Sequence, residues 1–300
     1  MVEGRLGVMP ELPEVTALAA DLDGRLKGRV IDRLSIVAFS ALKTFDPPAD
    51  ALHGLTIAGV SRHGKFLDIA AGELHVVVHL ARAGWIRWRD APPPPPNGRL
   101  GKGPLAARLV LDDGSGLDIT EAGTKKSLAI YLVRDPQDVP GIASLGPDPL
   151  TDDFTLEKFR DILRAEGRKQ LKGVLRHQGT IAGIGNAYSD EILHAARMSP
   201  FKPASSLLET EDDTDLVILY DAIRVTLGDA VDRSRGLAAS ELKSEKKSNL
   251  AVHAQTGKPC PVCGDTVREV SFADSSLQYC PTCQTGGKPL ADRRMSKLLK

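Results

Sequence analysis

The chain has 300 residues, 42% of them hydrophobic, so it can bury a sizeable core and form two domains. Lysine plus arginine equal aspartate plus glutamate at 39 each, so the net charge is zero and does not by itself indicate a nucleic-acid partner. No run of about 18 apolar residues occurs, which excludes a transmembrane helix. All four cysteines lie between positions 260 and 283, which is typical of a metal site in a reducing compartment.

Residues 9–15 read Met-Pro-Glu-Leu-Pro-Glu-Val and form the most informative segment. If Pro10 begins the mature chain, its nitrogen is a secondary amine that can attack the anomeric carbon of a sugar. The resulting iminium is permanently cationic, so this would be nucleophilic catalysis of the Schiff-base type, with the carboxylate of Glu11 beside the nucleophile. The alternative is a proline-rich entry into a helix, because proline is favoured in the first helical turn.

Eight residues, 1–8, precede Met9 and decide whether this chemistry is possible. If translation starts at Met1, the nitrogen of Pro10 is an amide and cannot act as a nucleophile. If it starts at Met9, removal of that methionine frees the amine. The eight residues lack the features of a signal peptide. We interpret them as a mis-called start or a tag; the alternative is a true extension that silences the site.

The rest of the N-terminal half predicts a β-rich domain behind one helix. Apolar residues at helical spacing from Leu12 to Leu26 predict a helix over residues 13–27. Residues 92–96 form a polyproline spacer, and the Asp-Asp-Gly-Ser-Gly segment at 112–116 indicates a hairpin turn. The predicted strands span 30–37, 55–63, 65–70, 74–80, 84–89, 108–111, 117–120 and 125–133.

The second half predicts helices followed by a small cysteine module. Proline and glycine in the segment 135–152 indicate a linker. Residues 236–249 are polar and charged, and we expect a mobile loop there. The predicted helices contain Leu156–Leu163, Leu171–Leu175, Asn186–Arg197 and Leu216–Val231.

Two Cys-x2-Cys pairs, separated by sixteen residues, form the cysteine module. Each pair lets two thiolates reach one ion from a tight turn, and the two turns close a tetrahedral site. Residues 267–270 and 277–279 are predicted to form a hairpin between them. Since all four positions are filled, a bound Zn²⁺ would be structural rather than catalytic. Four ordinary buried cysteines are the alternative. The ligands would be Cys260, Cys263, Cys280 and Cys283.

A glycine-rich turn at residues 181–191 joins two of the predicted helices and reads Ile-Ala-Gly-Ile-Gly-Asn-Ala-Tyr-Ser-Asp-Glu. Its glycines permit a tight turn, and the new helix begins near Asn186. Backbone N–H groups at a helix start favour a phosphate, and the Asn186 side chain can add a donor. The alternative is that the glycines serve helix packing alone.

Together these motifs resemble the Fpg/Nei family of bacterial DNA glycosylases, most closely its formamidopyrimidine-DNA glycosylase branch. The resemblance covers residues 9–287 and implies an α+β fold. This fold has an N-terminal β-sandwich with a leading helix, a helix–two-turn–helix domain and a C-terminal zinc-finger β-hairpin, with DNA bound between the two halves. The resemblance rests on five motifs. They are the start at 10–15, His-Gly-Lys-Phe-Leu at 63–67, Leu-Gly-Pro-Asp-Pro-Leu at 145–150, the turn at 183–191 and the four cysteines in order.

The resemblance also implies where the domains of the chain begin and end. We expect an upstream extension, a catalytic β-sandwich domain, a linker, a helix–two-turn–helix DNA-binding domain, a loop with the four-cysteine finger, and a basic tail. In the same order, these parts span residues 1–8, 9–134, 135–152, 153–240, 241–287 and 288–300.

The resemblance assigns roles to the matching positions. Pro10 would be the nucleophile at the sugar C1′, and Glu11 a general acid and base near the ring oxygen. Lys65 would contact the phosphate beside the lesion and assist elimination; the alternative is a solvated turn lysine. Asn186, with Gly185 before it, would hold a flanking phosphate. For Glu14, a site role and a structural role as a helix-dipole or capping carboxylate are equal alternatives.

Three departures from the family pattern concern damage recognition. The family's His-Leu-Gly-Met-x-Gly motif appears at 79–84 with Arg82 in place of the methionine that fills the gap left by a flipped base. The family's Asp-Pro-Arg-Arg-Phe-Gly loop is replaced at 121–126, so Lys125 lies in a segment with no aromatic wedge. Ser275, beside Asp274, stands where the finger usually offers an arginine. Arg82 and Lys125 remain candidate DNA contacts.

The sequence therefore predicts a bifunctional DNA glycosylase and abasic-site lyase of base-excision repair. It would act on damaged double- or single-stranded DNA as a monomer in the bacterial cytoplasm and nucleoid, with one structural Zn²⁺ and no membrane partner. A non-catalytic DNA-binding or damage-sensing relative is the main alternative. A zinc-ribbon partner module without DNA is a third. The preferred lesion and the base opposite it stay open.

Overall fold

The computed structural model describes residues 9–93, 103–122, 125–209, 212–272 and 275–291. The predictions made for residues 1–8, most of the basic tail, Gly123, Thr124 and Asp274 lie outside these residues. The chain forms two compact units, one of residues 1–144 with 233–245 and one of residues 145–232 with 246–300. The boundary at 144 falls inside the predicted linker, which contains the short helices η3 (Pro136–Asp138) and α2 (Pro140–Ala143).

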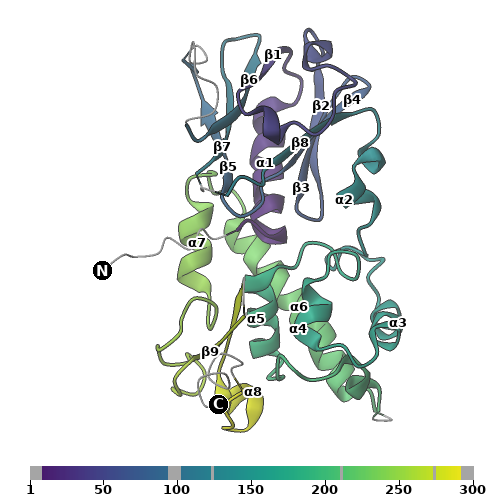
Figure 1. Cartoon of the computed structure of the whole chain (residues 1–300), viewed down its shortest axis with the longest axis vertical. Coiled ribbons are helices and arrows are strands. Elements are labelled where there is room, and N and C mark those ends of the chain that lie inside the picture. The colour runs from purple at the N-terminus through teal and green to yellow at the C-terminus, as the bar shows by residue number, and fades with distance from the viewer. Residues whose placement is uncertain (1–8, 94–102, 123–124, 210–211, 273–274, 292–300) are drawn as a thin grey trace. The chain divides into compact units, whose positions relative to one another are not determined.

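The first unit is a β-sandwich of two four-stranded antiparallel sheets (Figure 1). One sheet has the strand order β1-β6-β7-β5 and the other the order β2-β3-β4-β8. Two single-turn helices, η1 (Phe39–Ala41) and η2 (Ala49–Leu52), follow β1. The strands are β1 (Ile31–Ile36), β2 (Ile57–His63), β3 (Phe66–Ala71), β4 (Leu74–His79), β5 (Gly84–Arg89), β6 (Leu105–Leu111), β7 (Gly116–Glu121) and β8 (Ala129–Val133).

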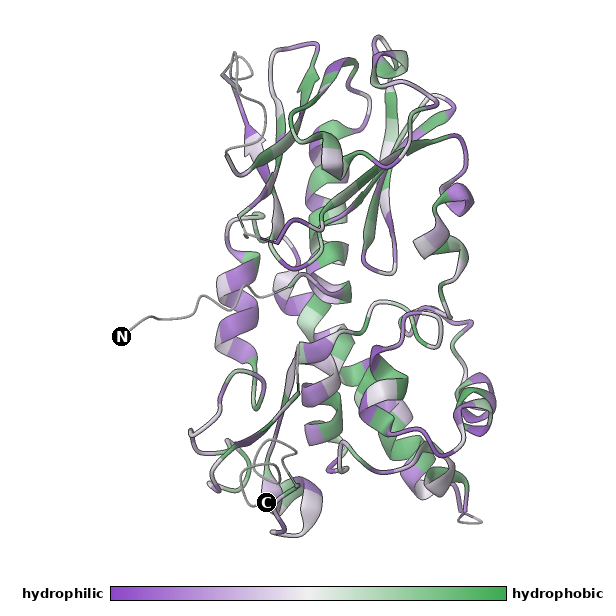
Figure 2. Ribbon diagram, viewed as in Figure 1, coloured by the Kyte–Doolittle hydropathy of each residue, from purple (hydrophilic) through white to green (hydrophobic). Residues whose placement is uncertain are grey.

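Helix α1 (Leu12–Leu26) completes the core of this unit. Its apolar residues, at the three- and four-residue spacing of a helical face, enter the same buried cluster as side chains from both sheets. Gly28 ends the helix with a φ of +80°, a left-handed conformation that glycine adopts without strain. The predicted helix over 13–27 differs from the observed one by one residue at each end, and Figure 2 shows hydrophobic and hydrophilic residues along α1.

The second unit contains the predicted helices and the cysteine module. An aromatic group of Phe154, Phe159 and Tyr220, with ring centroids 5.6–6.2 Å apart, anchors its core. The elements are α3 (Leu156–Glu166), α4 (Leu171–Arg176), α5 (Asn186–Ala195), η4 (Ala204–Leu208), α6 (Thr214–Ser234, whose last two residues lie in the first unit), β9 (Arg268–Ser271), β10 (Ser276–Tyr279) and α8 (Pro281–Thr285).

The expected mobile loop at 236–249 is wrong in its second half, because Leu242–Asn249 forms helix α7. Leu242 is fully buried in the core of the first unit. The indole of Trp85 donates a hydrogen bond of 3.0 Å to the carbonyl of Ala239, and the Lys243 ammonium lies 4.3 Å from the Trp85 ring centroid. One buried leucine and these contacts order a segment that looks polar by composition and in Figure 2.

The predicted strand over 125–133 begins four residues late. The backbone N–H groups of Ser127 and Leu128 donate to Oε1 of Glu121, at 2.7 and 3.0 Å, instead of to a neighbouring strand. The segment before Ala129 is thus held as a loop by one buried carboxylate. This alternative partner for the backbone is not visible in the alternation of side chains.

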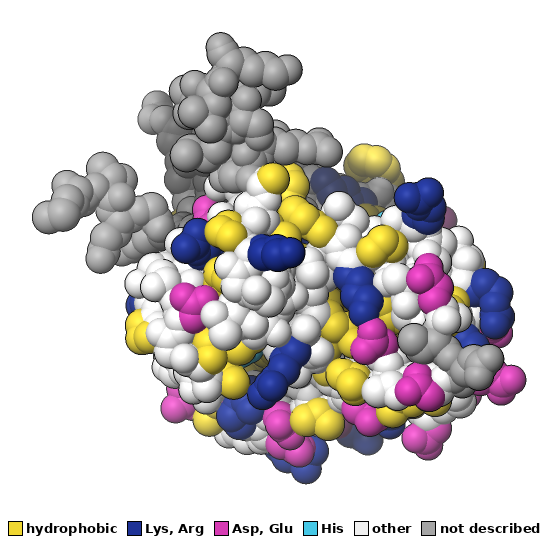
Figure 3. All heavy atoms as spheres, turned by 90° about the horizontal axis from the view of Figure 1, so that it is seen from below, with side chains coloured by type: hydrophobic (Ala, Val, Ile, Leu, Met, Phe, Trp, Pro, Cys, Tyr) yellow, Lys and Arg dark blue, Asp and Glu magenta, His cyan; other side chains and the backbone are white. Residues whose placement is uncertain are grey.

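No helix in the described part of the chain is long and apolar enough to cross a membrane. The face drawn in Figure 3 carries lysine and arginine interspersed with aspartate and glutamate. This mixture agrees with the zero net charge of the sequence.

The role of Leu242 generates a stability prediction. Leu242→Ala should lower the free energy of unfolding by about 2–5 kcal/mol, because it leaves a cavity under α7. The measurement is urea unfolding of the full chain by circular dichroism. Lys247→Ala, an exposed substitution on the same helix, is the matched control and should change stability by no more than about 0.5 kcal/mol. Equal effects of the two substitutions would contradict the anchoring role of Leu242.

Candidate active site and metal centre

The first turn of α1 holds two buried glutamates with different surroundings. Glu11 is the residue before the helix, in an extended conformation, and its backbone N–H donates to Oε2 of Glu14 at 2.8 Å. Glu14 therefore acts as a capping carboxylate, one of the two roles considered for it. Pro10 and Glu11 are both buried at this helix start, where the helix dipole favours a negative charge.

Lys65 lies in the turn between β2 and β3. The pairing of His63 with Phe66 leaves Gly64 and Lys65 as a two-residue hairpin turn, and Gly64 has a φ of +53°. Glycine at the first turn position provides this conformation without strain. The alternative of a solvated lysine is wrong, because Lys65 is only 8% exposed.

Two side-chain contacts align α1 antiparallel to β2. Oδ1 of Asp23, late in the helix, accepts the backbone N–H of Val60 at 2.7 Å. The hydroxyl oxygen of Thr16, one turn after the helix start, accepts a hydrogen bond of 2.6 Å from Nε of Arg62. Continuing from Thr16 to Glu11 covers about 7.5 Å at 1.5 Å per helical residue, and two residues beyond Arg62 cover about 6.6 Å of strand. The start of α1 and the turn with Lys65 therefore lie at the same end of the first unit.

The pKa of His79 reflects its burial and the positive charge of Lys65 at this end of the first unit. Burial and the neighbouring Lys65 ammonium lower the pKa of His79 to about 4. The imidazole ring packs at a tilt of 39° against the ring of Phe66, the residue after Lys65, with the ring centroids 4.6 Å apart. At neutral pH His79 is thus uncharged, and Lys65 is the cation of this pair. In the sequence His79 is visible only as part of a motif, whereas the pairing of β3 with β4 places it opposite Phe66.

Arg82 and Lys125 are exposed on two adjoining loops of the first unit. Arg82 lies in the β4–β5 turn, where Ala81 has a φ of +52° and the backbone N–H of Gly84 donates to Leu80. The loops meet where the Ala122 N–H donates to the Ala83 carbonyl at 3.1 Å. The structure therefore brings the loops of the two candidate DNA contacts together.

The glycine-rich turn leads into α5 as predicted. Gln178 clamps it, accepting from the Gly183 N–H at 3.0 Å and donating to the Ile184 carbonyl at 2.6 Å. Nδ2 of Asn186 donates to the Ser276 carbonyl in the β9–β10 hairpin at 2.8 Å. One side-chain N–H of Asn186 is thus already used, and a phosphate here would bind the second N–H and the backbone of the first turn.

A buried charge network lies beneath this turn and was missed by sequence reasoning. Nζ of Lys172 donates to the carbonyl of Asn186 at 2.7 Å and to Oδ1 of Asp190 at 2.6 Å. The second oxygen of Asp190 lies 2.7 Å from Nδ1 of His253. A buried charge is tolerated only when it is paired and hydrogen-bonded. The available signal was the presence of charged residues inside otherwise apolar helical patterns.

Glu191, the next residue, fixes the chain that leads to the cysteine module. Its carboxylate accepts three consecutive backbone N–H groups, those of Ala251, Val252 and His253, at 2.7–3.0 Å. Burial raises the pKa of Glu191, and these hydrogen bonds oppose that effect. The last residues of the glycine-turn motif therefore serve to position the finger.

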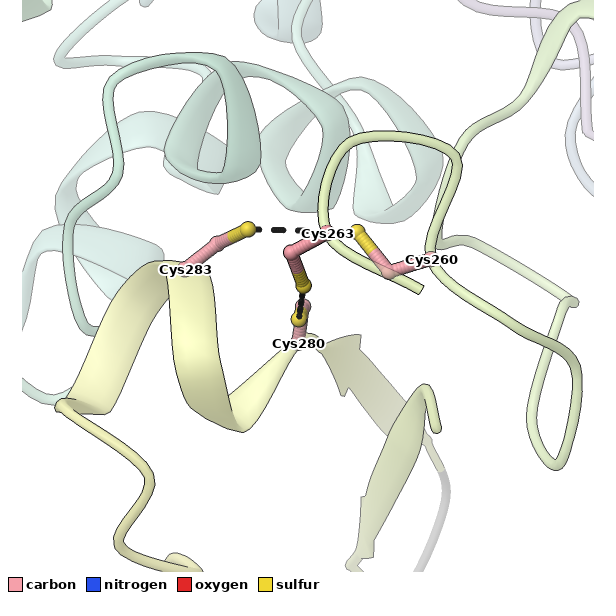
Figure 4. Close-up of side chains that lie close together, drawn as sticks. All are labelled: Cys260, Cys263, Cys280 and Cys283. Atoms are coloured by element: carbon pink, nitrogen blue, oxygen red, sulfur yellow. Dashed lines mark hydrogen bonds between the residues drawn. The ribbon is translucent and has the colours of Figure 1, made fainter. Parts of the chain in front are cut away.

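The four cysteine sulfurs converge on one point (Figure 4). All four lie within 4.8 Å of one another; Cys260 and Cys283 are 3.9 Å apart, and Cys263 and Cys280 are 3.4 Å apart. Zinc–sulfur bonds of about 2.3 Å in a tetrahedron place sulfurs about 3.8 Å apart, so the set fits one structural Zn²⁺. Burial and the neighbouring thiols raise the pKa of Cys280 to about 11, so four thiolates gather only around a cation.

His194 connects α5 directly to this site. Its Nε2 lies 3.2 Å from the sulfur of Cys260, and the ring is buried. Burial and the charge of Arg197 lower the pKa of His194, which favours a neutral ring. Since a metal-bound thiolate can only accept, the ring nitrogen facing it must carry the proton.

Comparison with known families matches three segments of the chain. Residues 9–124 match the formamidopyrimidine-DNA glycosylase N-terminal domain, and residues 145–241 match the H2TH domain of the same enzyme. Residues 257–286 match the zinc finger found in FPG and IleRS. The four cysteines lie within this last segment, which confirms the predicted zinc finger.

Comparison with individual proteins also finds similarity to formamidopyrimidine-DNA glycosylases. An uncharacterized formamidopyrimidine-DNA glycosylase-like protein of Mycobacterium tuberculosis is 57% identical over 161 residues, which cover 54% of this chain and 98% of that protein. The formamidopyrimidine-DNA glycosylase of Heliobacterium modesticaldum is 33% identical over 92% of this chain and 100% of its own length. The structure of Lactococcus lactis Fpg with DNA containing an abasic site superimposes with a TM-score of 0.78 at 27% identity, covering 92% and 99% of the two chains.

The pKa of His79 generates a pH prediction. Folded His79 protonates near pH 4, whereas in the unfolded chain it does so near 6.5. Between these values the unfolded state binds more protons, so stability falls as the pH is lowered from 7 to 4, by up to about 3 kcal/mol. His79→Phe keeps a ring without titration and should remove this part of the loss. Urea unfolding at several pH values measures it; an unchanged pH profile in the variant would contradict it.

The contact of His194 with Cys260 generates a metal prediction. His194→Phe keeps the ring but removes the donor, and zinc affinity should fall roughly 10- to 100-fold, as for other partners of metal ligands. Competition with a chromophoric chelator measures the affinity. His53→Phe, at an exposed position of the first unit, is the control and should leave it unchanged. The role given to the His194 ring would be refuted by equal affinities in both variants.

Proposed function

Because the chain belongs to the formamidopyrimidine-DNA glycosylase family, we propose that it is a bifunctional DNA glycosylase and abasic-site lyase of base-excision repair. One observation carries the proposal. The buried start of α1, with Pro10 and Glu11, lies at the same end of the first unit as the buried Lys65. A nucleophile, a carboxylate and a cation are the three groups that base removal followed by strand cleavage requires.

Base removal begins with the amine of Pro10, in a chain in which that residue is first. Its nitrogen bonds to C1′ of the damaged nucleotide while the bond from C1′ to the base breaks. The Glu11 carboxylate takes the proton that the nitrogen loses and delivers it to the departing base. Positive charge develops on the sugar in this step, and a carboxylate held at a buried helix start stabilises it.

Strand cleavage needs the sugar ring to open first. The C1′–O4′ bond breaks, O4′ takes a proton that Glu11 relays from water, and the nitrogen lone pair forms the iminium that joins Pro10 to C1′. This cation acidifies the C2′–H bond; the Glu11 carboxylate takes that proton, and the electron pair expels the 3′-phosphate and breaks the strand. The Lys65 ammonium stabilises the negative charge of the phosphate. Water then hydrolyses the iminium and restores the amine. Every bond change is completed within this sequence without a redox group.

DNA would be held through its phosphates by the start of α5, with Gly185 and Asn186, and by Arg82 and Lys125. The 121–126 segment offers no aromatic wedge. Flipping a base out of an intact duplex costs a few kcal/mol, about the amount that a wedge helps to offset. We therefore propose that abasic sites and single strands are better substrates than intact oxidised pairs. The fold match to Lactococcus lactis Fpg bound to abasic-site DNA supports this substrate class.

A second candidate function is non-catalytic DNA binding. The observations that favour it are the replaced recognition positions Arg82, Lys125 and Ser275. In addition, the nitrogen of Pro10 is an amide in any chain that retains Met9. Such a protein would bind damaged DNA and form no covalent intermediate.

The test compares two versions of this protein that differ only in where they start. One begins at Pro10 and the other is the 300-residue chain. Each is incubated with duplex and single-stranded oligonucleotides that carry an abasic site or 8-oxoguanine, and borohydride is added. The version that begins at Pro10 should give a trapped covalent band, strongest with the abasic site. The 300-residue chain should give none, because an amide nitrogen cannot form an iminium.

Each outcome of this comparison has one meaning. Trapping by both versions would show that the nucleophile is another amine. Trapping by neither, while DNA binding persists, would favour the non-catalytic function. Circular dichroism of both versions checks that removal of nine residues leaves the fold intact.

A further inference from the structure

A small cavity in the first unit lies outside the residues assigned so far. Its volume is about 210 Å³, and its walls come from η1, the start of β6 and the loop between β7 and β8. Cavities for drug-sized ligands measure roughly 300–1,000 Å³, so this one suits a smaller group such as a single planar ring system. Ala106, Leu105 and Leu128 supply an apolar wall.

An exposed aromatic ring stands at this cavity. Phe39, in η1, lines it and is 68% exposed. A phenylalanine face costs free energy in water and offers a stacking surface to a planar ring. Phe45, six residues later, is 89% exposed but does not line the cavity. Phe39 therefore combines an exposed face with an adjoining space of the right size.

Two lysines lie at this cavity: Lys126 lines it, and Lys43 contacts the lining residue Ser40. Nζ of Lys43 donates to the carbonyl of Ser40, and Nζ of Lys126 donates to that of Glu121 at 2.5 Å. Both carbonyl-bearing residues line the cavity. Among the described residues neither ammonium forms an ion pair with a carboxylate. Their charge is therefore available to phosphate groups beside the cavity.

A carboxylate supplies the polar group inside. Glu121 lines the cavity and is 3% exposed. Both hydrogen bonds that its carboxylate accepts from the described residues, from Ser127 and Leu128, fall on Oε1. Oε2 is thus left to accept from an amino or imino group, as carboxylates do with the N4 amino group of cytosine.

We propose that this cavity binds one unpaired nucleobase of DNA, stacked on Phe39, with its flanking phosphates on Lys43 and Lys126. This inference rests on the proposed function and concerns the form of DNA that the protein prefers. An apolar wall, an aromatic face, a carboxylate acceptor and two cations match a base that carries phosphates on both sides. A paired base cannot enter, since both its faces and its hydrogen-bonding edge are occupied in the duplex.

The experiment measures binding of the 300-residue chain to fluorescein-labelled DNA by polarization. The three probes are a single strand, a duplex with one unpaired base and a fully paired duplex. Phe39→Ala should weaken binding to the first two roughly 5- to 150-fold, the range expected for loss of one stacked base, and should change binding to the paired duplex by less than about twofold. Phe39→Trp should restore the affinity. Lys126→Ala should reduce the salt dependence by about one phosphate contact.

Phe45→Ala is the matched control, because it removes an exposed phenylalanine from the same segment and leaves the cavity intact. The inference is overturned if Phe39→Ala binds all three probes as the unaltered chain does. It is equally overturned if Phe45→Ala loses as much, or if the loss extends to the paired duplex. Failure of the unaltered chain to bind any of the three probes would also overturn the inference. Borohydride trapping by the version that begins at Pro10 is independent of these results.

Discussion

The alignment of α1 with β2 is the constraint on which the first unit depends. Asp23 holds the late part of the helix to the backbone of Val60, and Thr16 holds the early part to Arg62. The apolar face of the helix cannot shift along the sandwich without breaking these bonds and uncovering core side chains. As a result, the helix start with Pro10 is kept at the level of the turn that carries Lys65. A few hydrogen bonds thus bring two distant sequence motifs to the same end of the first unit.

The second unit depends on buried charges in a comparable way. Lys172, Asp190 and His253 form a paired chain beneath the glycine-rich turn, and Glu191 holds the segment that leads to the finger. An unpaired charge at any of these places would be costly, so the partners keep their positions. His194 extends the connection to the sulfur of Cys260. The phosphate-binding candidate at the helix start and the metal site therefore share one rigid support.

Sequence patterns gave good predictions wherever the responsible interaction is local. The helix from Leu12 to Leu26 and the four-cysteine hairpin follow from spacing along the chain, since side-chain periodicity and short metal-binding turns involve neighbouring residues. The predictions failed where a distant partner decides. Leu242 makes a helix of a polar segment by entering a remote core, and Glu121 delays the start of β8 by taking its backbone N–H groups. A polar composition does not reveal either partner.

The sequence by itself determined the family, the order of the elements, the zinc ligands and the candidate residues Pro10, Glu11 and Lys65. These depend on residue type and covalent spacing, which any reading of the chain can see. Tertiary structure alone decided that Lys65 is buried beside His79, that Asn186 spends one donor on the finger hairpin, and that Phe39 borders a cavity. Burial and partner choice arise only when segments far apart in the chain meet, because the exclusion of water and the pairing of polar groups are properties of the packed interior.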